Sequence, residues 1–218
     1  MTLRQFLLFT AVSLPACALL ILLFDQPLAL FVHRHFSGAA SFFGRLTAGA
    51  DAVHDALMTH LLGIPIIFLA LGLAFAVGRY LLRRPGATTF LVLLLTHEFS
   101  MVAARVLKGV VHRLRPEVLF STGYAGTGLW ASGPHNDSFP SSHTAVYCSL
   151  FLPLAVVFPR WRVPLLVLPG LIGIGRLVLG AHYLSDVWFS VWLVVGFTYL
   201  FGLLQRPAQQ ERSVRDTL

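Results

Sequence analysis

The chain has 218 residues, of which 56% are hydrophobic and only 11% are charged, and its mean hydropathy is +0.77. This composition excludes an ordinary soluble domain and predicts an integral membrane protein. The net charge of +7 is compatible with nucleic acid, anionic lipid or a phosphate substrate. The cations are scattered among apolar segments and form no continuous stripe, which argues against nucleic acid as a partner.

The apolar segments predict an all-α polytopic membrane protein, a six-transmembrane-helix bundle that forms a single domain over residues 1–218. The expected helices cover residues 5–24, 56–78, 87–107, 142–158, 164–180 and 186–204, and a polar tail follows at 205–218. Residues 25–55 mix apolar and basic side chains, and two interpretations stay open: a short helix in the membrane interface, or a loop that caps the bundle. Residues 117–139 are rich in glycine and predict a polar loop outside the membrane.

A charged stretch near the C-terminal end stands out, because Arg176, His182 and Asp186 lie in otherwise apolar sequence. On a helix, His182 and Asp186 would share one face, so that the carboxylate orients the imidazole and stabilises its charged form. Arg176 adds a planar cation suited to phosphate. The pattern indicates phosphoryl transfer through a phosphohistidine, and the alternative is a buried His–Asp pair that ties two helices together.

Two further stretches support the phosphoryl-transfer interpretation. Lys108 and Arg115 are seven positions apart and followed by proline, and His143 follows a Pro-Ser-Ser turn that begins at Pro140 and includes Ser141. In this order, Lys-x6-Arg-Pro, Pro-Ser-x-His and Arg-x5-His-x3-Asp resemble the motifs of the type-2 phosphatidic acid phosphatase superfamily. The resemblance covers Lys108 to Asp186, about a third of the chain.

The chain departs from the usual motifs at two positions. Ser142 stands where the second motif usually has glycine, and Gly175 stands where the third usually has serine. A serine keeps the backbone N–H of the glycine it replaces, provided that its φ is ordinary. Inside the first motif, His112 and Arg113 match no fixed position, so we expect them to contact a headgroup or to face water.

The resemblance implies a metal-free and cofactor-free hydrolysis in two steps. His182, oriented by Asp186, attacks phosphorus, while His143 protonates the leaving oxygen and then activates water. The residues implied to bind the phosphoryl oxygens are Lys108, Arg115, Ser141, Ser142 and Arg176. The residue chemistry alone would also permit the two histidines to exchange roles, and the aspartate four positions after His182 is the reason to name it the nucleophile.

The placement of arginines predicts the orientation. In a six-helix arrangement, a set of arginines and both termini lie on the same side of the membrane. The positive-inside rule makes that side cytoplasmic. This set comprises Arg4, Arg79, Arg83, Arg84, Arg160, Arg162, Arg206, Arg212 and Arg215. All three motifs then meet at the opposite, outer face. We therefore expect a multi-pass protein of a bacterial inner membrane whose active site faces the periplasm.

A site at the outer leaflet favours a lipid phosphatase acting on a phosphate monoester or a pyrophosphate. The candidate substrates are undecaprenyl pyrophosphate, phosphatidylglycerol phosphate, phosphatidic acid and the phosphates of lipid A. Two alternatives remain: a lipid phosphotransferase that uses the same intermediate, and a non-catalytic membrane protein that retains only the fold.

Overall fold

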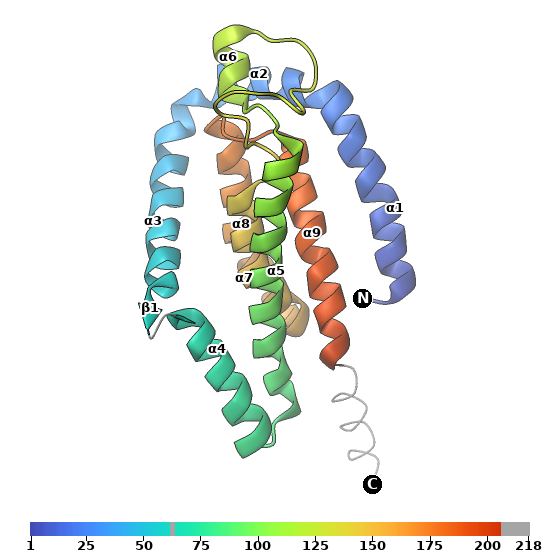
Figure 1. Ribbon diagram of the computed structural model, residues 1–218, viewed down its shortest axis with the longest axis vertical. Helices are drawn as coiled ribbons and strands as arrows, with labels where there is room; N and C mark the ends of the chain where they lie inside the picture. Colours follow the sequence, from blue (N-terminus) through green and yellow to red (C-terminus); the bar gives the residue numbers. More distant parts are fainter. Residues whose placement is uncertain (62–63, 206–218) are drawn as a thin grey trace.

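The structure is a computed structural model that describes residues 1–61 and 64–205 (Figure 1). The N-terminal part is helical apart from one short pair of strands. Its elements in chain order are α1 (Leu3–Leu19), a π-helical turn (Leu20–Phe24), α2 (Asp25–Phe36), a 3-10 turn (Ser37–Ala39), α3 (Ala40–Met58), β1 (His60–Leu61), β2 (Ile64–Pro65), α4 (Ile66–Ala76), a second π-helical turn (Val77–Leu81) and a 3-10 turn (Pro85–Ala87). The two strands pair antiparallel, with His60 opposite Pro65.

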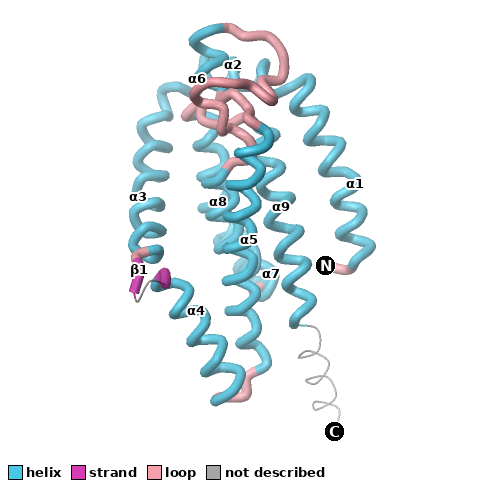
Figure 2. Tube along the Cα trace, viewed as in Figure 1, coloured by secondary structure: helices cyan, strands magenta, loops and turns pink. Residues whose placement is uncertain are grey.

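The C-terminal part contains the longest helices. Its elements are α5 (Thr88–Val111), α6 (Pro116–Thr122), α7 (Ser142–Val157), a 3-10 turn (Pro159–Trp161), α8 (Arg162–Val178), α9 (Leu184–Gly202) and a final 3-10 turn (Leu203–Gln205). Helix α7 packs against α5, α8 and α9, and α9 also packs against α5. Around them, α1 packs on α9, α3 on α8 and α4 on α5 (Figure 1). The long loops gather at the end of the bundle where α2 and α6 lie (Figure 2).

Small side chains form the contact between the central helices. Ala104 of α5, Ala145 and Cys148 of α7 and Val194 of α9 make one buried cluster. Small residues let helix backbones approach closely, which in a membrane replaces the hydrophobic driving force that water supplies to soluble bundles. This packing fixes the relative positions of the helix ends from which the motif residues project.

The helix expected at 56–78 is wrong as a continuous element. Helix α3 ends at Met58, the two-residue strands follow, and α4 begins at Ile66. Pro65 explains the break, because a proline disfavours helical backbone in the residue before it. Pro65 is itself the residue that precedes α4. Of the two interpretations of residues 25–55, a capping loop is wrong: the segment is almost entirely helical, as α2 and most of α3.

Helix α3 has an inverted amphipathic pattern. Thr47, Asp51 and His54 recur at helical spacing, and Thr47 is buried, whereas Phe42 and Val53 are exposed. A membrane helix with its polar face toward the protein and its apolar face outward shows this arrangement. The pattern places a carboxylate and an imidazole of α3 toward the bundle.

The other expected helices agree with the structure to within a few residues at each end. The segment expected at 5–24 is α1 with its π-helical turn, and 87–107, 142–158, 164–180 and 186–204 correspond to α5, α7, α8 and α9. The loop expected at 117–139 contains the short helix α6. The polar tail expected at 205–218 lies, from residue 206 on, outside the described residues.

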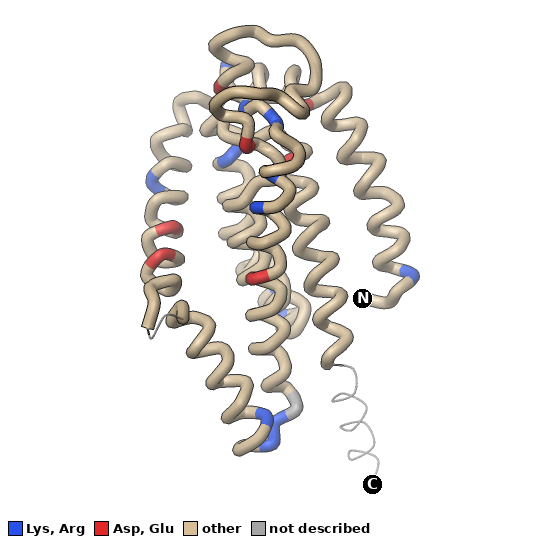
Figure 3. Tube along the Cα trace, viewed as in Figure 1, with Lys and Arg blue, Asp and Glu red and all other residues tan. Residues whose placement is uncertain are grey.

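Within the described part of the chain, four helical stretches are long and apolar enough to cross a membrane: Leu3–Met58, Thr88–Thr122, Pro159–Val178 and Leu184–Gln205. Ile66–Leu81 and Ser142–Val157 are shorter apolar helices. Lys and Arg concentrate at the turn between α4 and α5 and, at the other end, beside the loops near α6 (Figure 3). The all-α, membrane-like fold is therefore established, while the six-span count and the side of the termini stay predictions.

Candidate active site

The three motif segments meet at the end of the bundle where α2 and α6 lie, and backbone hydrogen bonds join them. The N–H of Ser138, just before the second motif, donates to the carbonyl of Arg113 in the first, over 2.9 Å. The N–H of Ser141 donates to the carbonyl of Asp186 over 3.3 Å, which joins the second motif to the third. The N–H of Glu117 donates to the carbonyl of Gly180 over 3.1 Å. Segments far apart in sequence are thus held in one assembly.

His182 lies in the connection between α8 and α9, with 2% of its surface exposed. Its Nδ1 lies 2.6 Å from the carbonyl oxygen of Ser138. A carbonyl can only accept, so Nδ1 carries the proton and Nε2 presents its lone pair. Burial lowers the pKa of His182 to about 4, although the carboxylate of Asp186 acts in the opposite direction. A neutral imidazole with a free Nε2 is the form a nucleophile requires.

His182 and Asp186 do not share a helix, in agreement with the expected helices 164–180 and 186–204, so the argument from a shared helical face does not apply. Helix α9 begins at Leu184, and Tyr183 is the residue that caps it. Asp186 lies in its first turn, where its Oδ2 accepts from the backbone N–H of Tyr183 over 2.8 Å and from the hydroxyl of Ser138 over 2.6 Å. The same oxygen lies 3.7 Å from Nδ1 of His182, an ion-pair distance longer than a hydrogen bond. Ser138 therefore holds His182 directly, and Asp186 supports it electrostatically and through Ser138.

Arg113 occupies the centre of this assembly, contrary to the expectation that it contacts a headgroup or water. Its side chain is 1% exposed. One terminal nitrogen donates to Asp186 over 2.6 Å and the other to Asp25 of α2 over 2.7 Å. The guanidinium also lies 4.3 Å from the ring centroid of Tyr183, at cation–π distance. Arg113 thus connects the start of α9 with α2 and fixes the carboxylate behind the histidine.

Two of the expected phosphate-binding cations are engaged by one residue. Arg115 forms a bidentate ion pair with the carboxylate of Asp137, with both N–O distances 2.8 Å. Lys108 donates to the backbone carbonyl of Asp137. Burial alone would raise the pKa of Asp137, but the hydrogen bonds and charge of Arg115, together with the charge of Lys108, lower it below its ordinary value. Arg176 differs, because its Nε is buried without a hydrogen-bond partner among the described residues. Asp137 thus engages two of the expected phosphate-binding cations, whereas no hydrogen bond satisfies Nε of Arg176 among the described residues.

The second motif forms the N-terminus of α7. Ser141 is the N-cap, and its hydroxyl oxygen accepts from the backbone N–H of Thr144 over 3.4 Å and from its hydroxyl over 2.9 Å. Ser142 is the first residue of the helix, and its φ is not positive. It therefore offers the same helix-end N–H as the glycine it replaces.

Gly175, the other departure from the usual motif, has a steric explanation. A Cβ at this position would come within 2.9 Å of a ring carbon of Phe43 in α3. The close approach of α3 to α8 therefore requires glycine here unless the phenylalanine moves.

His143, the second residue of α7, contacts a carboxylate that the sequence analysis did not single out. Its Nε2 lies 3.1 Å from Oδ2 of Asp51 in α3. The other oxygen of Asp51 accepts from the hydroxyl of Tyr147 over 2.7 Å. The polar spacing of Thr47, Asp51 and His54 is the signal that could have placed Asp51 on the inner face of a helix.

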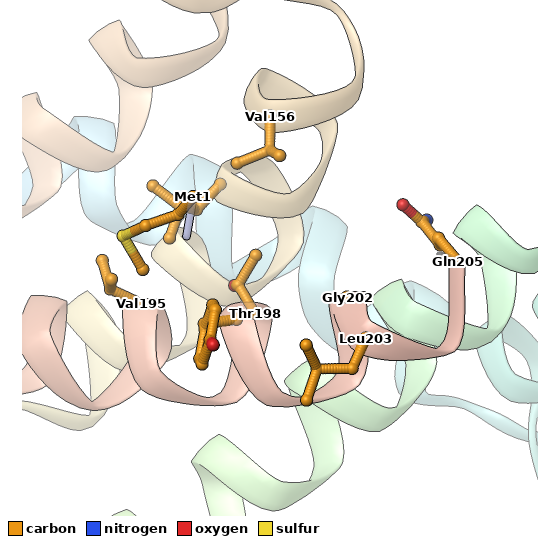
Figure 4. A pocket seen from close by; sticks show the side chains of 9 residues that line it. Met1, Val156, Val195, Thr198, Gly202, Leu203 and Gln205 are labelled. Atoms are coloured by element: carbon orange, nitrogen blue, oxygen red, sulfur yellow. The ribbon is translucent and has the colours of Figure 1, made fainter. Parts of the chain in front are cut away.

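Other potential sites are sparse. Among residues 1–61 and 64–205, no group of three or more His, Cys, Asp or Glu side chains is arranged to hold a metal ion. A cavity of about 390 Å³ lies between the ends of α7 and α9 and the N-terminus, and its lining includes Met1, Val156, Thr198 and Leu203 (Figure 4). This cavity is at the end of α9 remote from His182. The charged cluster at the α2–α6 end is therefore the candidate site.

The fold and this cluster define a helical, membrane-like protein with lysine and arginine side chains gathered near a buried histidine. Residues 87–210 match the PAP2 superfamily, the type-2 phosphatidic acid phosphatases, and the chain belongs to that superfamily. It is also similar to a lipid A 1-phosphatase of Rhizobium johnstonii, with 32% identity over 124 residues that cover 53% of this chain and 50% of the relative. A lipid A 1-phosphatase of Rhizobium etli is 33% identical over 104 residues, which cover 44% of this chain and 45% of the relative. The chain spans about half the length of these relatives. No solved structure matches it.

Proposed function

We propose that this protein is an integral membrane phosphatase that hydrolyses a lipid phosphate, with a lipid A phosphate as the first substrate to test. The single observation that carries the proposal is His182, buried and neutral, with Nδ1 held by a backbone carbonyl at 2.6 Å and with the charges of Lys108 and Arg176 close to its ring. The superfamily and the names of the two rhizobial relatives support the substrate class.

The proposed reaction proceeds in two steps without a metal or cofactor. Nε2 of His182 attacks phosphorus, the bond to the leaving oxygen breaks, and His143 gives that oxygen its proton. Water deprotonated by His143 then cleaves the phosphohistidine and releases phosphate. Lys108, Arg115 and Arg176 stabilise the charge that develops on the phosphoryl oxygens, and the N–H groups at the start of α7 extend this cradle.

Substrate binding must release Arg115 from Asp137. A lipid phosphate carries more charge than a carboxylate and offers more oxygens, so it can replace the Asp137 carboxylate on the Arg115 fork. This exchange would let Arg115, which Asp137 neutralises in the free protein, bind a dianion.

We further propose that the protein crosses the inner membrane of a bacterium six times, with both termini in the cytoplasm and the site at the outer leaflet. Arginines at the α4–α5 turn and the α7–α8 turn lie at the end of the bundle opposite the site, which the positive-inside rule makes cytoplasmic. A lipid could then reach His182 by lateral diffusion, with its tails in the bilayer and only its headgroup in the site.

The test is phosphate release by the purified protein in mixed vesicles. The four substrates are lipid A, undecaprenyl pyrophosphate, phosphatidylglycerol phosphate and phosphatidic acid, and mass spectrometry of the products distinguishes hydrolysis from transfer to a second lipid. His182→Ala should abolish release and the alkali-stable phosphoenzyme, whereas His135→Ala, which removes an exposed ring of the outer loop, should keep both. Phosphorylated lipid without free phosphate would establish the phosphotransferase alternative. Failure of all four lipids with folded protein would refute the proposal.

A further inference from the structure

The contact between Asp51 and His143 joins the second motif to a helix outside the matched family region. Asp51 lies on α3, and its two carboxylate oxygens contact His143 and Tyr147, which are one turn apart on α7. The side chains of His143 and Asp51 are 33% and 36% exposed, so water still reaches both. The carboxylate thus bridges an imidazole and a phenol at the rim of the site.

This geometry divides the two ring nitrogens of His143 between two tasks. Nε2 faces a carboxylate, which can only accept, so it carries a proton whether the ring is neutral or charged. Nδ1 is left for the leaving oxygen of the substrate. The hydroxyl of Tyr147 holds the second carboxylate oxygen at 2.7 Å and so limits rotation of Asp51.

The charges around His143 give Asp51 a second effect. Burial of the imidazole disfavours its positive charge most, Arg176 on α8 and Lys108 on α5 add to that effect, and Asp51 on α3 is the carboxylate that opposes them. The carboxylate of Asp186 is engaged by Arg113, Ser138 and the backbone of Tyr183 instead. A general acid needs its protonated form, and an adjacent carboxylate stabilises an imidazolium.

We propose that Asp51 is a positioning residue that orients His143 and stabilises its imidazolium, so that Nδ1 delivers the proton to the leaving oxygen. The inference rests on the proposed phosphatase function. In the first step the N–P bond forms at His182, the P–O bond breaks with its electron pair on the leaving oxygen, and the Nδ1 proton of His143 moves to that oxygen. In the second step Nδ1 takes a proton from water as the hydroxide attacks phosphorus, and the N–P bond breaks with its electron pair on Nε2 of His182. Phosphate is released, His182 is neutral again, and His143 is again an imidazolium.

The experiment compares wild type with Asp51→Asn, Asp51→Glu and the matched control Asp55→Asn. Asp55 lies one turn further along α3, is 80% exposed and lies 3.5 Å from Nδ1 of His54. The rate of phosphoenzyme formation is measured by rapid quench across pH with two substrates, a lipid phosphate and p-nitrophenyl phosphate. The lipid needs a proton on its leaving oxygen, whereas p-nitrophenolate leaves readily without one.

For Asp51→Asn we expect about a tenfold to hundredfold loss with the lipid phosphate and a much smaller loss with p-nitrophenyl phosphate. The alkaline limb of the lipid rate profile should move to lower pH, because the imidazolium loses its stabilising charge. Asp51→Glu should recover part of the rate, and Asp55→Asn should behave as wild type.

Equal losses with both substrates and an unchanged pH profile would show that Asp51 serves the fold alone and would overturn the proposal. If Asp51→Asn does not fold, Tyr147→Phe supplies the same test, since it frees Asp51 to rotate. It should give a smaller loss confined to the lipid substrate, and equal losses with both substrates would overturn the proposal. Failure of the phosphatase function itself is separate, because it would appear as an inactive wild type.

Discussion

Replacing Arg113 by methionine should strongly destabilise the folded protein, because it leaves two buried carboxylates without their cation. The side chains of Arg113, Asp25 and Asp186 are each no more than 1% exposed, and the guanidinium donates to one oxygen of each carboxylate. Removing one partner of a buried ion pair costs about 3–5 kcal/mol. Two carboxylates are affected here, so we expect a loss in the upper part of that range, or roughly a thousandfold in the folding equilibrium.

The assay is unfolding of the detergent-solubilised protein by heat and by denaturant, with Arg105→Met as the control. Arg105 is an exposed arginine of α5, and its replacement should change the free energy of unfolding by less than about 0.5 kcal/mol. Adding Asp25→Asn to Arg113→Met removes one of the stranded charges. The double variant should therefore recover about 1–3 kcal/mol relative to the single variant. An Arg113→Met protein as stable as the Arg105→Met control, or no recovery in the double variant, would refute the ion-bridge argument.

Further predictions concern the anion site, metals, pH and topology. Asp137→Ala frees Arg115, so the KM for lipid phosphate and the inhibition constant for vanadate should both fall; an unchanged KM would show that Asp137 does not compete with phosphate. Activity should survive EDTA, and loss that Mg²⁺ or Zn²⁺ restores would contradict a site built from side-chain cations. Because burial lowers the pKa of His182 to about 4, the imidazole stays neutral below the ordinary histidine range. Phosphoenzyme formation measured by alkaline quench should therefore persist down to about pH 5. If its rate instead fell with a midpoint near pH 6.5, the ring would be solvated. The topology is tested in a protein whose native cysteines are replaced. A cysteine at exposed Ser132 should react with an impermeant thiol reagent in intact cells, and a cysteine at Gly86 should react only after permeabilisation. The reverse labelling pattern would invert the topology.

The position of the site at one end of the bundle was predictable from the sequence, because the alternation of apolar helices and short turns brings the ends of alternate helices together. His143 and Arg176 lie where that alternation predicts, at the start of α7 and near the end of α8. The detailed support of His182 was not predictable. A four-residue spacing indicates proximity only if the backbone is helical, and here the helix begins two residues after the histidine.

The partners of Arg113 and His143 were beyond sequence reasoning for another reason. Arg113 contacts Asp25, which is 88 positions earlier, and His143 contacts Asp51, which is 92 positions earlier. Neither spacing corresponds to a local structural period, so only the packing of α2 and α3 against the end of the bundle reveals them. Helix α3 itself was obscured because its polar residues face inward, opposite to the pattern typical of a helix at a water interface.

Asp25 and Asp51 both lie before residue 87, where the match to the PAP2 superfamily begins. The matched region supplies the histidines and the cations, yet the carboxylate that shares Arg113 with Asp186 and the carboxylate beside His143 come from the N-terminal helices. A buried guanidinium and a half-buried imidazole near the membrane both need counter-charges, since the cost of an unpaired ion rises as water is excluded. The N-terminal helices therefore do more than anchor the chain, because they complete the electrostatics of the site. A protein that shares the three motifs but lacks carboxylates at these two positions must stabilise its buried arginine and the histidine of its second motif by other means.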